Sequence, residues 1–187
     1  MKKFFIMLTI TLYSGIMGNP VYLNPDFPVE ERVDDLLKRM TLEEKFWQIF
    51  MVPGDLEGNE ELLKNGIFGL QLQTLSRGSE ADQQMMDYGK LESNPFLMAE
   101  KANKIQKFLV EETRLKIPAI FFDEALHGLI REGSISFPQS ISLAASWNDS
   151  LMRDVCSVIS DEVKSRGIRQ VLSPVVNIPR DVRWGRV

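Results

Sequence analysis

Apolar residues recur every three or four positions in several stretches of the chain, which is the spacing of an amphipathic helix. Thr41 and Glu44 form a capping box at the start of one such stretch, and Pro53 and Gly54 are expected to end it. Asn148 is the expected cap of another. The predicted helices cover residues 29–40, 42–50, 98–114 and 149–166.

Short runs without charge between these helices predict β-strands. Such runs lie at 67–72, 118–122 and 171–176, and a run at 141–145 opens a further strand–helix unit. Residues 77–96 are polar and predict a long loop. The alternation of strand and helix predicts an α/β fold with a parallel sheet. A doubly wound sheet and a (β/α)8 barrel both fit this pattern, although a full barrel takes roughly 250 residues.

The first 18 residues differ from the rest of the chain. Lys2 and Lys3 are followed by an uncharged run at 4–17, which is the pattern of a secretory signal peptide. The run is too short for a convincing membrane span, and the alternatives are a buried N-terminal helix or an uncleaved anchor. We therefore expect residues 1–18 to be a signal peptide and the protein to be secreted or periplasmic.

Charge and cysteine content exclude several classes of function. The net charge of −4 and the pI of about 5.2 disfavour nucleic acid as a partner but do not affect neutral sugars. Cys156 is the single cysteine, so no intramolecular disulfide can form. Its place on a predicted helix face indicates a buried, inert thiol rather than a nucleophile.

Polar residues follow two of the predicted strands, where parallel α/β folds bind their ligands. Asp123 and Glu124 come directly after one strand. Adjacent side chains point in different directions, so one carboxylate could accept hydrogen bonds from ligand hydroxyls while the other pairs with an arginine. The alternative is a capping or salt-bridge role for both.

His127 is the single histidine, so a metal site built from several histidines is impossible. Without a G-x-S-x-G elbow, a hydrogen-bonded packing role for His127 is favoured over catalysis. The segment 180–186 concentrates three arginines around Asp181 and Trp184. It could bind phosphate, form a purely structural ion-pair loop, or be a braced loop that offers one guanidinium to a ligand.

Several motifs occur in a fixed order along almost the whole chain after the signal segment. They are NPD at 24–26, ERVDDLLKRMTLEEK at 31–45, IP at 117–118, EALHG at 124–128, FPQ at 137–139, LAASW at 143–147 and RDVRWGR at 180–186. In order and spacing this series resembles glycoside hydrolase family 3. The resemblance implies that residues 19–187 form roughly the first half of an incomplete (β/α)8 TIM-type barrel, with further C-terminal domains in the intact protein.

The resemblance also implies an activity. Members of the family are commonly exo-acting, retaining β-glucosidases or β-xylosidases that cleave oligo- or polysaccharide β-glycosides without a metal or an organic cofactor. In such a mechanism one carboxylate attacks the anomeric carbon and another, about 5–5.5 Å away, acts as acid and then base. The family's nucleophile and acid/base lie beyond Val187, so the isolated chain is expected to be inactive. The alternative is a non-catalytic remnant or sugar-binding piece.

Two substrate-binding positions are implied by the motifs. Glu124 matches an acidic residue that accepts hydroxyls of the nonreducing-end sugar, and Arg186 matches an arginine that donates to the same sugar. Asp181 and Arg183 resemble bracing residues of that loop, and His127 a supporting member of its motif. Many relatives have Asp in place of Glu124, a departure that favours pentosides, and Val182 replaces a usual proline.

Overall fold

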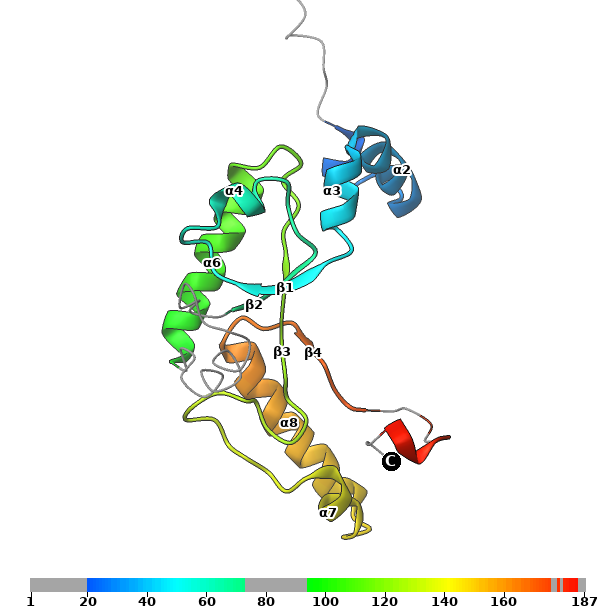
Figure 1. The fold of residues 1–187 in the computed structure, drawn as a ribbon, viewed down its shortest axis with the longest axis vertical. Helices are drawn as coiled ribbons and strands as arrows, with labels where there is room; N and C mark the ends of the chain where they lie inside the picture. Colours follow the sequence, from blue (N-terminus) through cyan, green and yellow to red (C-terminus); the bar gives the residue numbers. More distant parts are fainter. Residues whose placement is uncertain (1–19, 73–93, 176–177, 179, 185–187) are drawn as a thin grey trace, which may run out of the picture. The chain divides into compact units, whose positions relative to one another are not determined.

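The computed structural model describes residues 20–72, 94–175, 178 and 180–184 (Figure 1). The chain divides into two compact units, one ending at Lys45 and the other beginning at Phe46. The predicted signal peptide and most of the predicted loop at 77–96 lie outside the described residues.

The first unit is built around one amphipathic helix. The short helix η1 (Val21–Leu23) is tied to α2 (Val29–Arg39) by two hydrogen bonds. The Tyr22 N–H donates to Asp35 (3.1 Å), and Arg32 Nε donates to the Tyr22 carbonyl (3.1 Å). The predicted capping box is confirmed, because the Thr41 N–H donates to Glu44 Oε2 (2.8 Å) and the Glu44 N–H donates to Thr41 Oγ1 (3.2 Å).

The second unit contains a parallel sheet of four strands in sequential order. The strands are β1 (Met51–Gly54), β2 (Gly69–Leu72), β3 (Ile120–Asp123) and β4 (Gln170–Val171). The register pairs Gly69 with Ile120 and Phe122 with Gln170. The predicted α/β fold with a parallel sheet is therefore confirmed.

The elements between residues 42 and 63 differ from the prediction. The helix α3 (Leu42–Trp47) ends earlier than expected, and residues 51–54 form β1 instead of a helix terminus. Pro53 fits there because β1 is the outermost described strand, where a missing N–H costs no ladder bond. The short helix α4 (Glu60–Leu63) was not predicted.

The predicted strand at 141–145 is wrong, because α7 (Ser140–Ala144) is a helical turn. A strand would place Ile141 and Leu143 on one face, since its side chains repeat every two residues. In the structure Leu143 is buried while Ile141 is 79% exposed.

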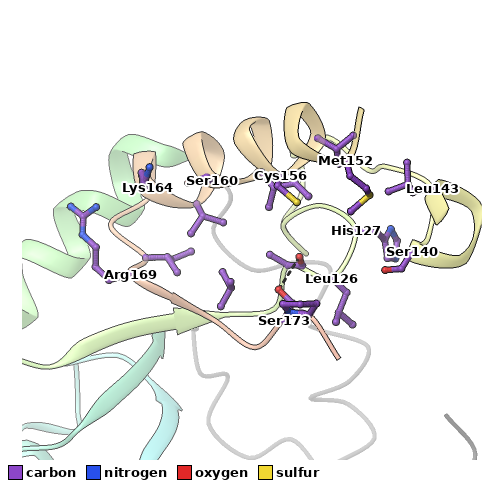
Figure 2. Close-up of a pocket in the computed structure, with 17 residues that line it drawn as sticks. Leu126, His127, Ser140, Leu143, Met152, Cys156, Ser160, Lys164, Arg169 and Ser173 are labelled. Carbon is purple, nitrogen blue, oxygen red and sulfur yellow. Dashed lines mark hydrogen bonds between the residues drawn. The ribbon is translucent and has the colours of Figure 1, made fainter. Parts of the chain in front are cut away.

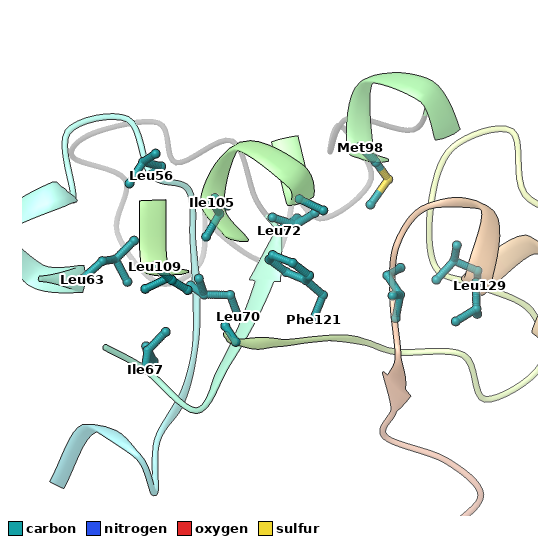
Figure 3. Packing of buried hydrophobic residues seen from close by; sticks show 14 of the residues in the cluster. Leu56, Leu63, Ile67, Leu70, Leu72, Met98, Ile105, Leu109, Phe121 and Leu129 are labelled. Atoms are coloured by element: carbon teal, nitrogen blue, oxygen red, sulfur yellow. The ribbon is translucent and has the colours of Figure 1, made fainter. Parts of the chain in front are cut away.

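The core lies where α6 (Pro95–Glu111) covers the sheet (Figure 3). It includes Leu70 and Leu72 of β2 and Phe121 of β3. The predicted helical stripe is confirmed, because α6 buries four residues of one face: Met98, Ala102, Ile105 and Leu109. The helix α8 (Asp149–Ser165) adds Val163 to this core, and its predicted cap Asn148 accepts from the Leu151 N–H (3.0 Å).

The loop after β3 folds back on itself. The Phe137 N–H donates to the His127 carbonyl (2.7 Å), and the Ile135 N–H donates to the Glu162 carboxylate on α8 (3.1 Å). Gly128, between these contacts, has φ of 124°. A Cβ at this position would lie 2.2 Å from the Ile135 carbonyl oxygen, so the loop can close only around glycine.

Leu109→Ala should lower the free energy of unfolding by about 2–5 kcal/mol, because it removes a fully buried side chain and leaves a cavity. Val110→Ala, one residue further on the same helix, is the matched control, since Val110 is 40% exposed. It should change stability by less than about 0.5 kcal/mol. Urea unfolding of the purified protein measures both, and equal losses would contradict the position of the core.

Gly128→Ala should destabilise the protein by about 3 kcal/mol or more, since it adds a backbone clash to an unfavourable φ. The control is Gly133→Ala in the same loop, where φ is 75° but no atom lies within 4 Å of an added Cβ. That change should cost only about 1–2 kcal/mol, from backbone strain alone. The difference between the two unfolding midpoints is the measurement, and a Gly133 variant as unstable as the Gly128 variant would refute the loop geometry.

Candidate functional site

The two carboxylates at the end of β3 occupy different environments. Asp123 is fully buried, at 0% exposure, while Glu124 is half-buried. The sequence left two interpretations of the pair open, and in one of them a single carboxylate bonds to an arginine. The structure identifies that carboxylate as Asp123 and the arginine as Arg131, a residue that the sequence analysis did not single out.

Asp123 is the centre of a buried polar cluster. Its Oδ2 accepts from Arg131 Nε (2.7 Å) and lies 2.6 Å from Arg131 Nη2, which makes a two-point ion pair. Its Oδ1 accepts from Gln71 Nε2 (2.9 Å) and from the Glu124 N–H (2.8 Å). Arg131 Nη2 also donates to the Leu72 carbonyl (2.8 Å). The cluster therefore joins β2, β3 and the following loop.

A second arginine, Arg166, lies close enough to interact electrostatically with this cluster. Burial is the main cause that lowers the pKa of Arg166. The negative charges of Glu162 and Asp123 raise this pKa in part, while the positive charge of Arg131 lowers it further. Arg166 Nη1 also donates to the Glu162 carbonyl (3.0 Å). Two cations thus face two carboxylates, which keeps the local charge balanced.

Glu124 is held by its backbone. Its N–H donates to Asp123, and its carbonyl accepts from the Ile130 N–H (3.1 Å). Within the described ranges, the structure gives the Glu124 carboxylate no hydrogen bond or ion pair. An ionised carboxylate accepts hydrogen bonds through both oxygens, so this side chain is chemically suited to ligand hydroxyls.

The His127 side chain forms a hydrogen bond within its own loop. Its Nδ1 lies 2.9 Å from the Phe137 carbonyl oxygen, and because a carbonyl can only accept, Nδ1 carries the proton. Together with the bond from the Phe137 N–H to the His127 carbonyl, this makes a two-way link across the loop. The contact is the kind of hydrogen-bonded packing that the sequence analysis favoured for this residue.

The segment after β4 contains an exposed ion pair. Arg183 donates to Asp181 from its backbone N–H (2.9 Å), from Nε (2.9 and 3.0 Å) and from Nη2. The side-chain bond from Arg183, followed by the backbone bond, holds the pKa of Asp181 below its usual value, and the same side-chain bond raises the pKa of Arg183. Arg186 lies outside the described residues, so Glu124 is the predicted sugar contact whose surroundings the structure defines.

A cavity of about 420 Å³ lies between α8 and the segments that follow β3 and β4 (Figure 2). Its walls are mainly apolar and include Leu126, Met152 and Ile159, whereas Glu124 does not line it. Sugar hydroxyls need polar partners, so this cavity is not the candidate site. Cys156 also lines it and is exposed, so the prediction of a buried thiol is wrong: Cys156 lies beside the buried stripe of α8 rather than within it.

In the part of the chain that the structure describes, no group of three His, Cys, Asp or Glu side chains is placed to hold a metal ion. None of the described helices combines the length and apolar character needed to cross a bilayer.

Comparison with known proteins places these features in a family. Residues 41–187 match the model of the glycosyl hydrolase family 3 N terminal domain. The chain is 32% identical to beta-glucosidase C of Emericella nidulans over 179 residues, covering 90% of this chain and 27% of the relative. It is 29% identical to a periplasmic beta-glucosidase/beta-xylosidase of Dickeya chrysanthemi over 173 residues, covering 86% of this chain and 25% of the relative.

A periplasmic beta-glucosidase of Salmonella typhimurium is 29% identical over 158 residues, which are 82% of this chain and 17% of the relative. The chain thus spans about a quarter or less of the length of these relatives. The match to the family model covers most of the chain, including β3, its two carboxylates and the loop that follows. The chain therefore belongs to glycoside hydrolase family 3.

Proposed function

We propose that this chain supplies part of the sugar-binding site of a retaining, exo-acting β-glucosidase or β-xylosidase. In this proposal Glu124 and Arg186 bind the hydroxyls of the nonreducing-end sugar, and His127, Asp181 and Arg183 support them. The names of the relatives favour the same two activities. The observation that carries the proposal is a half-buried carboxylate, fixed through its backbone, directly after β3.

The strand order supports a barrel as the setting of this site. A doubly wound sheet contains a point where the strand order reverses, whereas the strands of a (β/α)8 barrel follow one another around the sheet. The order β1-β2-β3-β4 has no reversal. We therefore favour the first half of a TIM-type barrel, in which substrates bind at the carboxyl ends of the strands.

The proposed chemistry requires two further carboxylates, a nucleophile and an acid/base, about 5–5.5 Å apart. No residue of this chain is assigned to either role. Glu124 and Arg186 would act by binding and orienting the sugar, since a carboxylate accepts from hydroxyls and a guanidinium donates to them. Secretion or a periplasmic location is part of the proposal, based on Lys2, Lys3 and the apolar run behind them.

A non-catalytic sugar-binding role is the second candidate. It is favoured by the two carboxylates at the end of β3, because a retaining mechanism needs a pair of carboxylates that both reach the substrate. Asp123 is buried and bonded to Arg131, which leaves Glu124 alone at that strand end to meet a ligand. This candidate keeps the sugar site and removes only the turnover.

Turnover of aryl β-glucosides and aryl β-xylosides by the complete product of the gene that encodes this chain tests the proposal. Glu124→Gln should lower kcat/KM by about 10- to 100-fold, mainly through KM, because charge-assisted hydrogen bonds to the sugar are lost. Glu132→Gln is the matched control, since Glu132 is exposed in the same loop. Its kcat/KM should stay within about twofold of wild type.

Two results would contradict the proposal, one against the hydrolase activity and the other against the role of Glu124. The first is a complete lack of turnover on every β-glycoside tried. If xylose or glucose still binds in calorimetric titration in that case, the non-catalytic sugar-binding role is preferred. The other is equal activity of the Glu124 and Glu132 variants, which would remove Glu124 from the sugar site.

A further inference from the structure

The buried cluster around Asp123 has a feature that a general stabilising role does not require. Both backbone polar groups of Glu124 are bonded to residues that the ion pair holds in place. The Glu124 N–H donates to Asp123 Oδ1, while its carbonyl accepts from Ile130, the residue directly before Arg131. One peptide group beside the Glu124 Cα is therefore bonded to the ion pair itself, and the other is bonded to the residue next to Arg131 in the chain.

The rotamer of Asp123 is itself strongly determined. Oδ2 is held by Arg131 from the loop, and Oδ1 is held by Gln71 from β2. Rotation of this carboxylate would break bonds to both elements at once. Asp123 therefore gives the Glu124 N–H a fixed acceptor, which sets the direction of the Glu124 Cα–Cβ bond.

Stability alone is a weak explanation for such a pair. The side chains of Arg131 and Asp123 are 1% and 0% exposed, so both charges have lost their water. Desolvation of this kind often cancels the attraction, and apolar replacement of a buried ion pair is often neutral or stabilising. What the pair supplies that apolar residues cannot is a set of directed bonds.

We propose that Asp123, Arg131 and Gln71 are positioning residues that orient Glu124 towards the sugar. The inference rests on the proposed function of Glu124 and extends it to three residues that do not themselves touch the sugar. A misplacement of about 1 Å in a binding group can cost as much as 100-fold in rate, so a clamp on the Glu124 backbone has a measurable consequence.

The first variant is Asp123→Asn, which keeps the shape of the side chain and removes its charge. In the complete gene product, KM for an aryl β-glycoside should rise about tenfold, with a smaller change in kcat, because the sugar contact is weakened in ground and transition states alike. Adding Glu124→Gln to this variant should then cost less than about threefold, since coupled residues are not additive. Leu109→Ala is the control, because it destabilises the core and should leave KM unchanged.

A second variant covers the case in which Asp123→Asn does not fold because Arg131 is left unpaired. Gln71→Met, Asp123→Leu and Arg131→Met together replace the whole cluster by apolar side chains, a change that buried ion clusters can tolerate. This protein should also show the raised KM. Hydrogen exchange of the wild-type protein adds a measurement that needs no variant, since the Glu124 amide should exchange at least about tenfold more slowly than the Glu132 amide.

The outcomes separate the inference from the proposed function. If the wild-type protein hydrolyses β-glycosides but the cluster variants keep a wild-type KM, as Leu109→Ala should, the cluster is structural and the inference is wrong. An unprotected Glu124 amide would overturn it as well. If the wild-type protein neither turns over a β-glycoside nor binds the sugar in calorimetric titration, the proposed function fails, and the inference fails with it.

Discussion

The ion pair between Asp123 and Arg131 is the interaction on which the organisation of the second unit's strand ends depends. Both charges are removed from water, and isolated charges cannot stay buried without partners. The partners available are Gln71 on β2, the Leu72 carbonyl and the Glu124 N–H, and the pair uses all of them. Because these groups come from two strands and a loop, the bonds that they make with the ion pair also set the relative geometry of those segments.

The pair also explains how two adjacent carboxylates can have separate tasks. Asp123 is fully occupied by its bonds in the interior, so its negative charge is neutralised before any ligand arrives. Glu124, one residue later, keeps its carboxylate half-buried at the strand end while its backbone is bonded on both sides. The loop beyond is closed by its own contacts, including the two-way link between His127 and Phe137. Sugar binding is thus proposed for Glu124, because its carboxylate is not taken up by bonds within the described part of the fold.

Much of this fold could be predicted from periodicity, because α6, α8 and the runs that contain β2 and β3 have clear apolar patterns. The errors came from local signals that tertiary packing overrides. Pro53 and Gly54 are typical of a helix end but lie in β1, and Ile141 and Leu143 alternate like a strand but lie in a helical turn. In the candidate site, the strand end predicted a polar pair, Asp123 and Glu124, and the resemblance to the family selected Glu124. Arg131 was not predicted, because no sequence spacing shows that the loop returns its guanidinium to Asp123.

The sheet topology bears on the remaining half of the proposed sugar site. β3 and β4 are neighbours and run parallel, with Asp123 in register with Val171, so the chain leaves both strands at the same edge of the sheet. Glu124 follows β3 at this edge, and the segment that leads to Asp181 and Arg183 starts from β4. A site shared by the two segments requires strands that are adjacent and parallel, because an intervening or antiparallel strand would separate the two strand ends. The order of β3 and β4 meets that requirement. Asp181 and Arg183 are bonded to each other, so in a braced loop of this kind the ligand would bind a different guanidinium.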